Sequence, residues 1–250
     1  MPTILITGAA SGLGAAFLTH YNTNPSNKIF ALDINPIPTS HASHPENIHP
    51  HTLDLTNEPA LLSYATSIAT EPIHLLLHSA GIRGLVPALS SQHPTNVAAA
   101  ETLSAIDLET IMQTFQTNTL ATFALLRALL PNLLISLQQP GTQPKVIIMS
   151  SRMGSLSNNT LPNPSAGSAY AYRASKAAVN MIVRSLAMDV PEVVWVLCHP
   201  GRVATGLVRG REEGAIEAEE SVEGMVRLIE GWGVGDSGGF YDRFGEVIPW

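Results

Sequence analysis

The chain has few cysteines and few charged residues. A single cysteine, Cys198, excludes an internal disulfide and any zinc site built from several cysteines. Because Cys198 follows the apolar run Val193–Leu197, we expect it to be a buried structural thiol. Charged residues make up 13% of the 250 residues, about half of the usual share, while the 45% apolar share is ordinary for a globular protein. Disorder is therefore not expected.

Basic residues are outnumbered by acidic ones, 13 to 20, and the formal net charge is −7. A protein that binds nucleic acid needs a basic stripe to neutralise phosphates, so we expect no nucleic-acid partner. The longest apolar stretch, Leu120–Leu137, is interrupted by Arg127 and Pro131, which favours a buried helix over a membrane span. A strand expected at Thr3–Thr7 leaves no room for a secretory signal, and we expect a cytoplasmic protein.

Several histidines lie close together between residues 41 and 51, at His41, His44, His49 and His51. Their spacing matches no compact ligand pattern, and no cysteine or pair of carboxylates completes a set. We therefore expect no metal site.

Short apolar runs alternate with longer segments of helical periodicity. Runs such as Val146–Met149 are typical of strands buried on both faces of a parallel sheet. This alternation predicts βαβ units, and therefore an α/β fold with a doubly wound parallel sheet of Rossmann type. No linker divides the chain, so we expect a single domain over residues 1–250. The expected strands are Thr3–Thr7, Lys28–Asp33, Ile48–Leu55, Ile73–Ser79, Lys145–Ser150 and Val193–Cys198, and the expected helices are Gly12–Tyr21, Pro59–Ala69, Glu109–Leu137 and Ala171–Met188.

A glycine-rich segment, Thr7–Gly14, lies between the first expected strand and the first expected helix. Its sequence is Thr-Gly-Ala-Ala-Ser-Gly-Leu-Gly, and it begins a βαβ unit whose second strand ends at Asp33. Glycines in this place permit a tight turn and let a pyrophosphate approach the backbone at a helix N-terminus. The alternative is a simple strand-to-helix turn with no ligand.

Tyr172 and Lys176 are four residues apart in an expected helix, and therefore lie on one face, one turn apart. An ammonium group beside a phenol favours the phenolate, so we expect the pKa of Tyr172 to lie below its usual value near ~10. Such a tyrosine can exchange a proton with an alcohol near neutral pH. The alternative is a surface pair with no role.

With both motifs, the chain resembles the short-chain dehydrogenases/reductases of the single-domain type over its full length. The resemblance implies that Tyr172 and Lys176 are catalytic. It implies the same for Asn118, on the long central helix, and for Ser151, three residues before a glycine, with Ser150 as the alternative. Finer details are similar to the C-factor and sniffer-like carbonyl reductases, namely Tyr170–Lys176, His199-Pro200-Gly201 and the terminal Ile248-Pro249-Trp250.

The resemblance also implies a nicotinamide dinucleotide site. The residues expected to bind the cofactor are Gly8, Ser11, Gly12, Leu13, Gly14, Asp33, Asp54, Leu55, Ser79, Ala80, Gly81, Tyr172, Lys176, Pro200, Gly201, Val203 and Thr205.

Two departures from the family pattern stand out. His78-Ser79-Ala80-Gly81 replaces the usual Asn-Asn-Ala-Gly, which puts local hydrogen bonding in doubt. Ser151 and Tyr172 are 21 positions apart, more than usual, and we expect the extra stretch Ser157–Ala166 to edge the substrate pocket.

Together these features predict an oxidoreductase that transfers a hydride between a nicotinamide cofactor and a carbonyl or secondary alcohol of a small organic substrate. Asp33 is placed to accept hydrogen bonds from the adenosine ribose and would repel a 2′-phosphate, so NAD is expected in preference to NADP. We expect a homodimer or homotetramer. The alternative is a dinucleotide-binding protein of the same fold that acts as a non-redox enzyme, a scaffold or a sensor.

Overall fold

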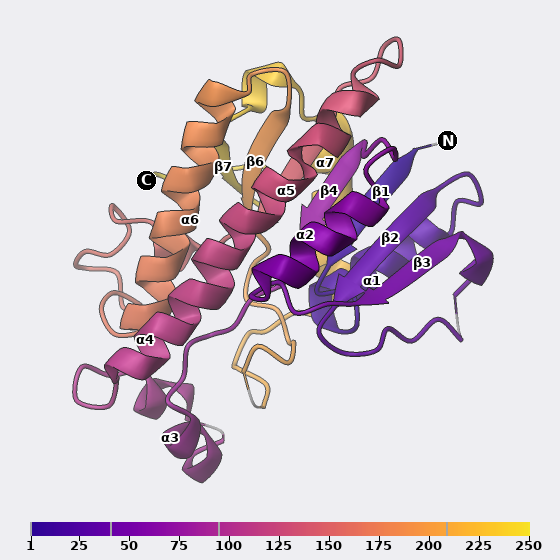
Figure 1. Ribbon diagram of the computed structural model, residues 1–250. Helices are drawn as coiled ribbons and strands as arrows, with labels where there is room; N and C mark the ends of the chain where they lie inside the picture. The colour runs from indigo at the N-terminus through magenta and orange to yellow at the C-terminus, as the bar shows by residue number, and fades with distance from the viewer. Residues whose placement is uncertain (1, 41, 95, 209) are drawn as a thin grey trace.

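Parallel strands form the centre of the protein, as the ribbon in Figure 1 shows. The computed structural model describes residues 2–40, 42–94, 96–208 and 210–250. Within these residues one seven-stranded sheet has the order β3-β2-β1-β4-β5-β6-β7, and all its pairings are parallel. The strands are β1 (Thr3–Thr7), β2 (Lys28–Asp33), β3 (Ile48–Thr52), β4 (Leu75–His78), β5 (Lys145–Met149), β6 (Val194–His199) and β7 (Gly239–Asp242). The predicted doubly wound Rossmann-type fold in a single domain is confirmed.

The expected strands Lys145–Ser150 and Val193–Cys198 differ from β5 and β6 by one residue at their ends, and three larger corrections are needed. The expected strand Ile48–Leu55 ends at Thr52, because the chain turns at Asp54, whose Oδ1 accepts from the Thr56 amide. The expected strand Ile73–Ser79 is limited to β4. The strand β7 was not predicted, because it is only four residues long, begins with a glycine and alternates in burial.

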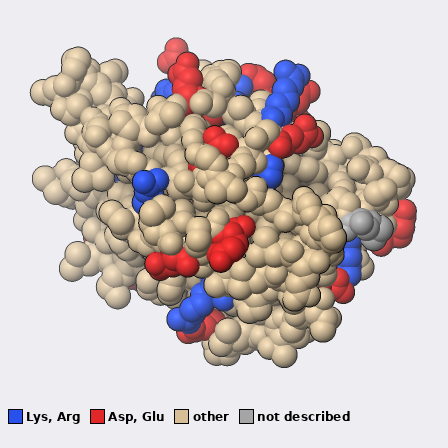
Figure 2. Space-filling model, turned by 90° about the horizontal axis from the view of Figure 1, so that it is seen from above, with Lys and Arg blue, Asp and Glu red and all other residues tan. Residues whose placement is uncertain are grey.

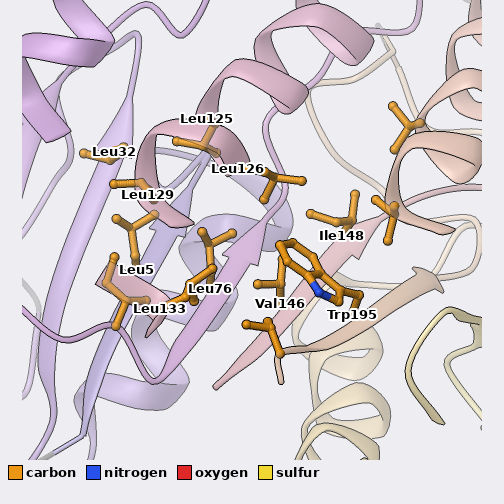
Figure 3. Packing of buried hydrophobic residues seen from close by; sticks show 14 of the residues in the cluster. Leu5, Leu32, Leu76, Leu125, Leu126, Leu129, Leu133, Val146, Ile148 and Trp195 are labelled. Atoms are coloured by element: carbon orange, nitrogen blue, oxygen red, sulfur yellow. The ribbon is translucent and has the colours of Figure 1, made fainter. Parts of the chain in front are cut away.

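Helices cover both faces of the sheet. Helices α1 (Gly12–Asn22) and α7 (Ala218–Gly231) pack on one face, and α2 (Glu58–Ser67), α5 (Ala121–Ser136) and α6 (Tyr170–Asp189) pack on the other. The helices α3 (Pro87–Gln92) and α7 were missed. On the α5 side, Leu125 and Leu129 point toward Leu5 and Leu76 of the sheet, and Trp195 fills the region under α6 (Figure 3).

The expected helix Glu109–Leu137 is interrupted by a wide turn. Helix α4 (Leu108–Phe115) and α5 are joined by a π-helical turn, Gln116–Leu120, and together they form one rod across the sheet (Figure 1). By length and hydropathy the segment Leu108–Ser136 could cross a membrane, but half of its most apolar 18-residue stretch is buried in the protein. It is therefore a core helix here.

Charged side chains are sparse and of mixed sign on the face that Figure 2 shows. Acidic and basic groups lie beside one another, and no broad basic surface is seen on this face. That distribution agrees with the low charged share of the sequence.

Candidate active site

A large cavity opens at the carboxyl ends of the strands. It has a volume of about 1010 Å³, and its lining includes Ser151, Tyr172, Thr205 and Leu13. The order of the strands reverses between β1 and β4, and in open α/β sheets ligands bind outside the carboxyl ends at such a reversal. The cavity holds the predicted catalytic residues Ser151 and Tyr172, and it reaches the start of α1 at Leu13.

The glycine-rich segment forms a close turn between β1 and α1. Gly8 has a φ of +68°, and a Cβ on Gly14 would lie 2.1 Å from the carbonyl oxygen of Gly8. A side chain at Gly14 would therefore push α1 away from β1. The amides at the start of α1, beginning with Gly12 and Leu13, remain available for an anionic group.

Asp33 lies beside this turn at the end of β2. Its Oδ2 accepts a hydrogen bond of 3.0 Å from the amide of Ala10, while the Ser11 side chain is exposed. The amide of Leu53 donates to the Asp33 carbonyl at 2.7 Å, which brings Asp54 and Leu55 next to Asp33. The structure thus brings these four predicted cofactor residues, Ser11, Asp33, Asp54 and Leu55, to one edge of the site.

The residues after β4 complete this half of the site. A Cβ on Gly8 would lie 2.9 Å from the amide nitrogen of Ala80, so the two backbones are in contact. The hydroxyl of Ser79 is buried and has no hydrogen-bond partner among the described residues. An unpartnered buried hydroxyl beside a glycine cradle fits a bound polar group such as a nucleotide.

His78 resolves the doubt about the missing asparagine. Its ring is 3% exposed and joins the hydroxyls of Thr7 and Thr122, each at 2.8 Å. Because the Thr122 hydroxyl donates to the carbonyl of Asn118, it must accept from His78 Nε2, and Nδ1 then accepts from Thr7. Burial, followed by the charge of Lys176, lowers the pKa of His78 to about 3. A neutral histidine therefore joins Thr7 of β1 to Thr122 of α5.

The loop after β6 returns to the glycine-rich turn. The Thr205 side chain lies 3.0 Å from the position of a Cβ on Gly12. Val203 forms a parallel bridge with Ile216, and both Pro200 and Gly201 line the cavity. The four predicted cofactor residues of this loop are therefore at the site.

Asn118 occupies the π turn, fully buried. Its Oδ1 accepts from the Ile82 amide at 2.8 Å, and its Nδ2 donates to the Ile82 carbonyl and to the Ser175 hydroxyl. The side chain therefore links the segment Gly81–Ile82, which follows β4, to α6. A Cβ on Gly81 would lie 3.1 Å from Asn118 Oδ1 and 3.8 Å from Lys176 Nζ, so these three residues lie together.

The two candidate serines have different surroundings. The Ser150 hydroxyl donates to Asn180 Oδ1 at 2.6 Å. The Ser151 hydroxyl accepts from the Met153 amide at 3.2 Å, and Ser151 is close enough to Tyr172 to lower the pKa of that phenol. The geometry favours Ser151 as the serine that acts with Tyr172.

Tyr172 and Lys176 are both buried on α6, as expected from their spacing. The expected lowering of the Tyr172 pKa by Lys176 is not seen. Burial raises the pKa of Tyr172, and the charge of Arg83 and the hydrogen bond with Ser151 oppose that rise. Lys176 Nζ donates to the Met149 carbonyl at 2.8 Å, and burial lowers its pKa to about 8.

Arg83 and Glu101 are site residues that the sequence alone did not reveal. They come from the long connection Gly81–Ser104 and form a buried pair beside Tyr172, with Arg83 Nε 2.9 Å from Glu101 Oε2. The expected stretch Ser157–Ala166 does reach the cavity, through Asn158 and Asn163. No group of three or more His, Cys, Asp or Glu side chains is placed to hold a metal ion in the described part of the chain, and His41 lies outside it.

A family model described as short chain dehydrogenase matches residues 2–215. The chain is 38% identical over 190 residues to "C-signal" of Myxococcus xanthus, covering 75% of this chain and 99% of that protein. Among solved structures, it is similar to the carbonyl reductase Sniffer of D. melanogaster, with a TM-score of 0.81, 28% identity and full coverage of both chains. The NADPH-bound carbonyl reductase from chicken fatty liver has a TM-score of 0.80 and 26% identity, with 100% of this chain and 94% of that chain covered.

The chain therefore belongs to the short-chain dehydrogenase/reductase family, and its structural relatives include sniffer-like carbonyl reductases. The resemblance drawn from the sequence is confirmed. Members of this class are oxidoreductases that bind a nicotinamide cofactor, and they act on small molecules.

Proposed function

We propose that the protein is a nicotinamide-dependent carbonyl reductase in which Tyr172 is the general acid. The observation that carries the proposal is that the buried Tyr172 and Ser151 line the same cavity and that Ser151 acts on the pKa of the Tyr172 phenol. The Gly8–Gly14 turn and the unpartnered Ser79 hydroxyl fit a dinucleotide. When bound, the nicotinamide supplies the hydride.

In this proposal each residue of the chain has a separate task. Tyr172 gives its proton to the oxygen of the reduced carbonyl, and Ser151 donates a hydrogen bond to the same oxygen. Lys176 holds the nicotinamide ribose and returns a proton toward Tyr172, a task suited to a group whose pKa is about 8. Asn118 would hold a water that connects Lys176 to solvent, and because its side chain is taken by Ile82 and Ser175, the main chain of the π turn is left for that contact.

We propose NAD as the preferred cofactor, since the Asp33 carboxylate lies beside the glycine-rich turn where a 2′-phosphate would meet like charge. NADPH is present in the chicken relative, so both cofactors are to be compared. A cytoplasmic location and a homodimer or homotetramer are also proposed. The support for assembly is the exposed apolar side chains Leu120 and Phe123 on the α4–α5 rod and Met181 on α6.

The test follows absorbance of NADH and NADPH while the protein is incubated with a panel of ketones, aldehydes and quinones. Consumption of reduced cofactor that depends on a carbonyl compound is expected, faster with NADH. Tight binding of cofactor with no turnover of any compound would contradict the proposal and favour a scaffold or sensor.

A further inference from the structure

Arg83 and Glu101 form a bidentate ion pair inside the site. Arg83 Nε and Nη2 donate to the two carboxylate oxygens of Glu101 at 2.9 and 3.0 Å. The side chains are only 13% and 8% exposed, respectively. A pair removed from water acts on neighbouring groups far more strongly than a surface pair, because the surrounding dielectric is low.

The guanidinium group of Arg83 is stacked on the ring of Tyr172. Its central carbon lies 4.9 Å from the ring centroid, whereas Lys176 Nζ lies 5.7 Å from it. The remaining Arg83 nitrogen, Nη1, contacts the sulfur of Met153 at 2.9 Å, so the guanidinium is held from a third side. Arg83 is thus the nearer of these two cations to the phenol ring.

Glu101 is also tied to the start of the helix that carries Tyr172. Its carbonyl accepts from the Ala169 amide at 2.9 Å and from the Ser168 hydroxyl at 3.0 Å. Ser168 and Ala169 have φ values of 52° and 49°, a left-handed conformation that non-glycine residues rarely adopt and that needs support from neighbours. The same residue therefore positions the arginine and the approach to α6.

The charges around Tyr172 oppose one another. The pKa of Tyr172 is raised by burial and by the charges of Glu101 and Glu212, and lowered by Arg83 and by the Ser151 hydrogen bond. The other nearby cations are occupied: Lys176 binds the Met149 carbonyl, and Arg173 binds the Gly167 and Ser168 carbonyls.

We propose that Arg83 and Glu101 are positioning residues that act as an opposed pair of charges on Tyr172, Arg83 promoting release of its proton and Glu101 restraining it. The inference rests on the proposed role of Tyr172 as the general acid. It adds Arg83 and Glu101, from the long connection after β4, to the residues that control the proton of Tyr172.

The test measures ionisation of Tyr172 by the tyrosinate absorbance titration of each variant minus that of the same variant carrying Tyr172→Phe. Arg83→Gln is expected to move the midpoint upward by about one pH unit or more, and Glu101→Gln to move it downward by a similar amount. Arg83→Lys, which keeps the charge, should stay near the parent. The matched controls are Arg127→Gln and Glu58→Gln, which alter an exposed ion pair whose arginine stacks on Phe123.

Opposite shifts distinguish this role from a merely structural one, because breaking the pair from either side would disturb packing in the same way. Shifts of the same sign, or no shift, would overturn the proposal. If Arg83→Gln fails to fold, Arg83→Lys and Glu101→Gln still give different expectations, no shift and a downward shift. The pH dependence of NADH- or NADPH-linked turnover, measured with any carbonyl compound of the panel that is reduced, should follow the same order. Since the titration needs no substrate, it reports on Arg83 and Glu101 even if the protein turns over no carbonyl compound.

Discussion

The two halves of the site are built in different ways. The nucleotide half is made largely by close approaches of glycine backbone, such as Gly8 against Gly14 and Gly8 against Ala80. The half around Tyr172 is made by side chains that meet across long separations, such as Asn118 with Ser175, 57 residues apart. The first half depends on the absence of side chains, and the second depends on specific polar groups. Substitutions should therefore impair binding in one half and proton transfer in the other.

Tyr172→Phe should have the largest effect, and it should impair only the half of the site around Tyr172. It keeps the ring under Arg83 but removes the proton donor, so turnover should fall by at least about 10²-fold with nearly unchanged cofactor affinity. Steady-state kinetics and cofactor titration measure the two quantities. Tyr170→Phe, at a half-exposed tyrosine two residues earlier, is the control. Near-normal turnover of Tyr172→Phe would remove Tyr172 from the mechanism.

Gly14→Ala should disrupt the nucleotide half of the site. The new methyl group would meet the Gly8 carbonyl, so α1 must shift, at a cost of about 1–3 kcal/mol in unfolding free energy and with at least about tenfold weaker cofactor binding. Chemical denaturation and cofactor titration check this result. Gly231→Ala, where a Cβ has nothing within 4 Å, should change neither quantity appreciably. Equal effects of the two substitutions would contradict the role given to the turn.

His78→Asn tests the residue that joins the two halves of the site, through the pH dependence of stability. The pKa of His78 is about 3 in the folded protein and 6.5 as the ordinary value, so only the unfolded chain takes up the proton as the pH falls between them. The fold therefore loses stability from this residue below about pH 6.5, by roughly 2 kcal/mol at about pH 5.

Denaturation at about pH 7 and about pH 5 should show that this loss is smaller in His78→Asn than in the parent. His20→Asn, at an exposed histidine, is the control. The same pH dependence in His78→Asn and the parent would show that His78 is not the titrating group. His199 is measured alongside, because burial lowers its pKa to about 4.

Asp33→Asn should have the smallest effect and test the charge in the nucleotide half alone. The amide keeps an oxygen for the Ala10 amide but removes the negative charge, so the ratio of kcat/KM for NADPH to that for NADH should rise about tenfold. Asp189→Asn, at an exposed aspartate at the end of α6, should leave the ratio unchanged. A parent enzyme that already prefers NADPH would show that Asp33 does not exclude the phosphate.

The contrast between local patterns and contacts across long separations also explains which features could be predicted from the sequence. The Rossmann fold and the Gly8–Gly14 turn depend on local patterns, so they could be read before the structure. The π turn could not, because the weak helix formers Thr117, Asn118 and Thr119 lower helix propensity without indicating which turn of the helix widens. Nor could the Arg83–Glu101 pair, since neither residue has a helical or strand pattern around it and the partners meet only through tertiary packing. The sequence predicts that the Lys176 ammonium lowers the pKa of Tyr172. Burial raises that pKa instead, and the nearer guanidinium of Arg83 is the cation that opposes the rise.

The π turn described above also sets the phase of the rod Leu108–Ser136. Thr110, Thr114, Asn118 and Thr122 are all buried and are spaced by four residues. On a regular α-helix such positions drift by about 40° at each step, so three steps would carry the stripe about a third of the way round. One wide turn in the middle recovers most of that drift, and a polar stripe can stay buried along the length of the rod. Deletion of a single residue between Gln116 and Leu120 would therefore act as a rotation of one half of the rod against the other, and only secondarily as a shortening.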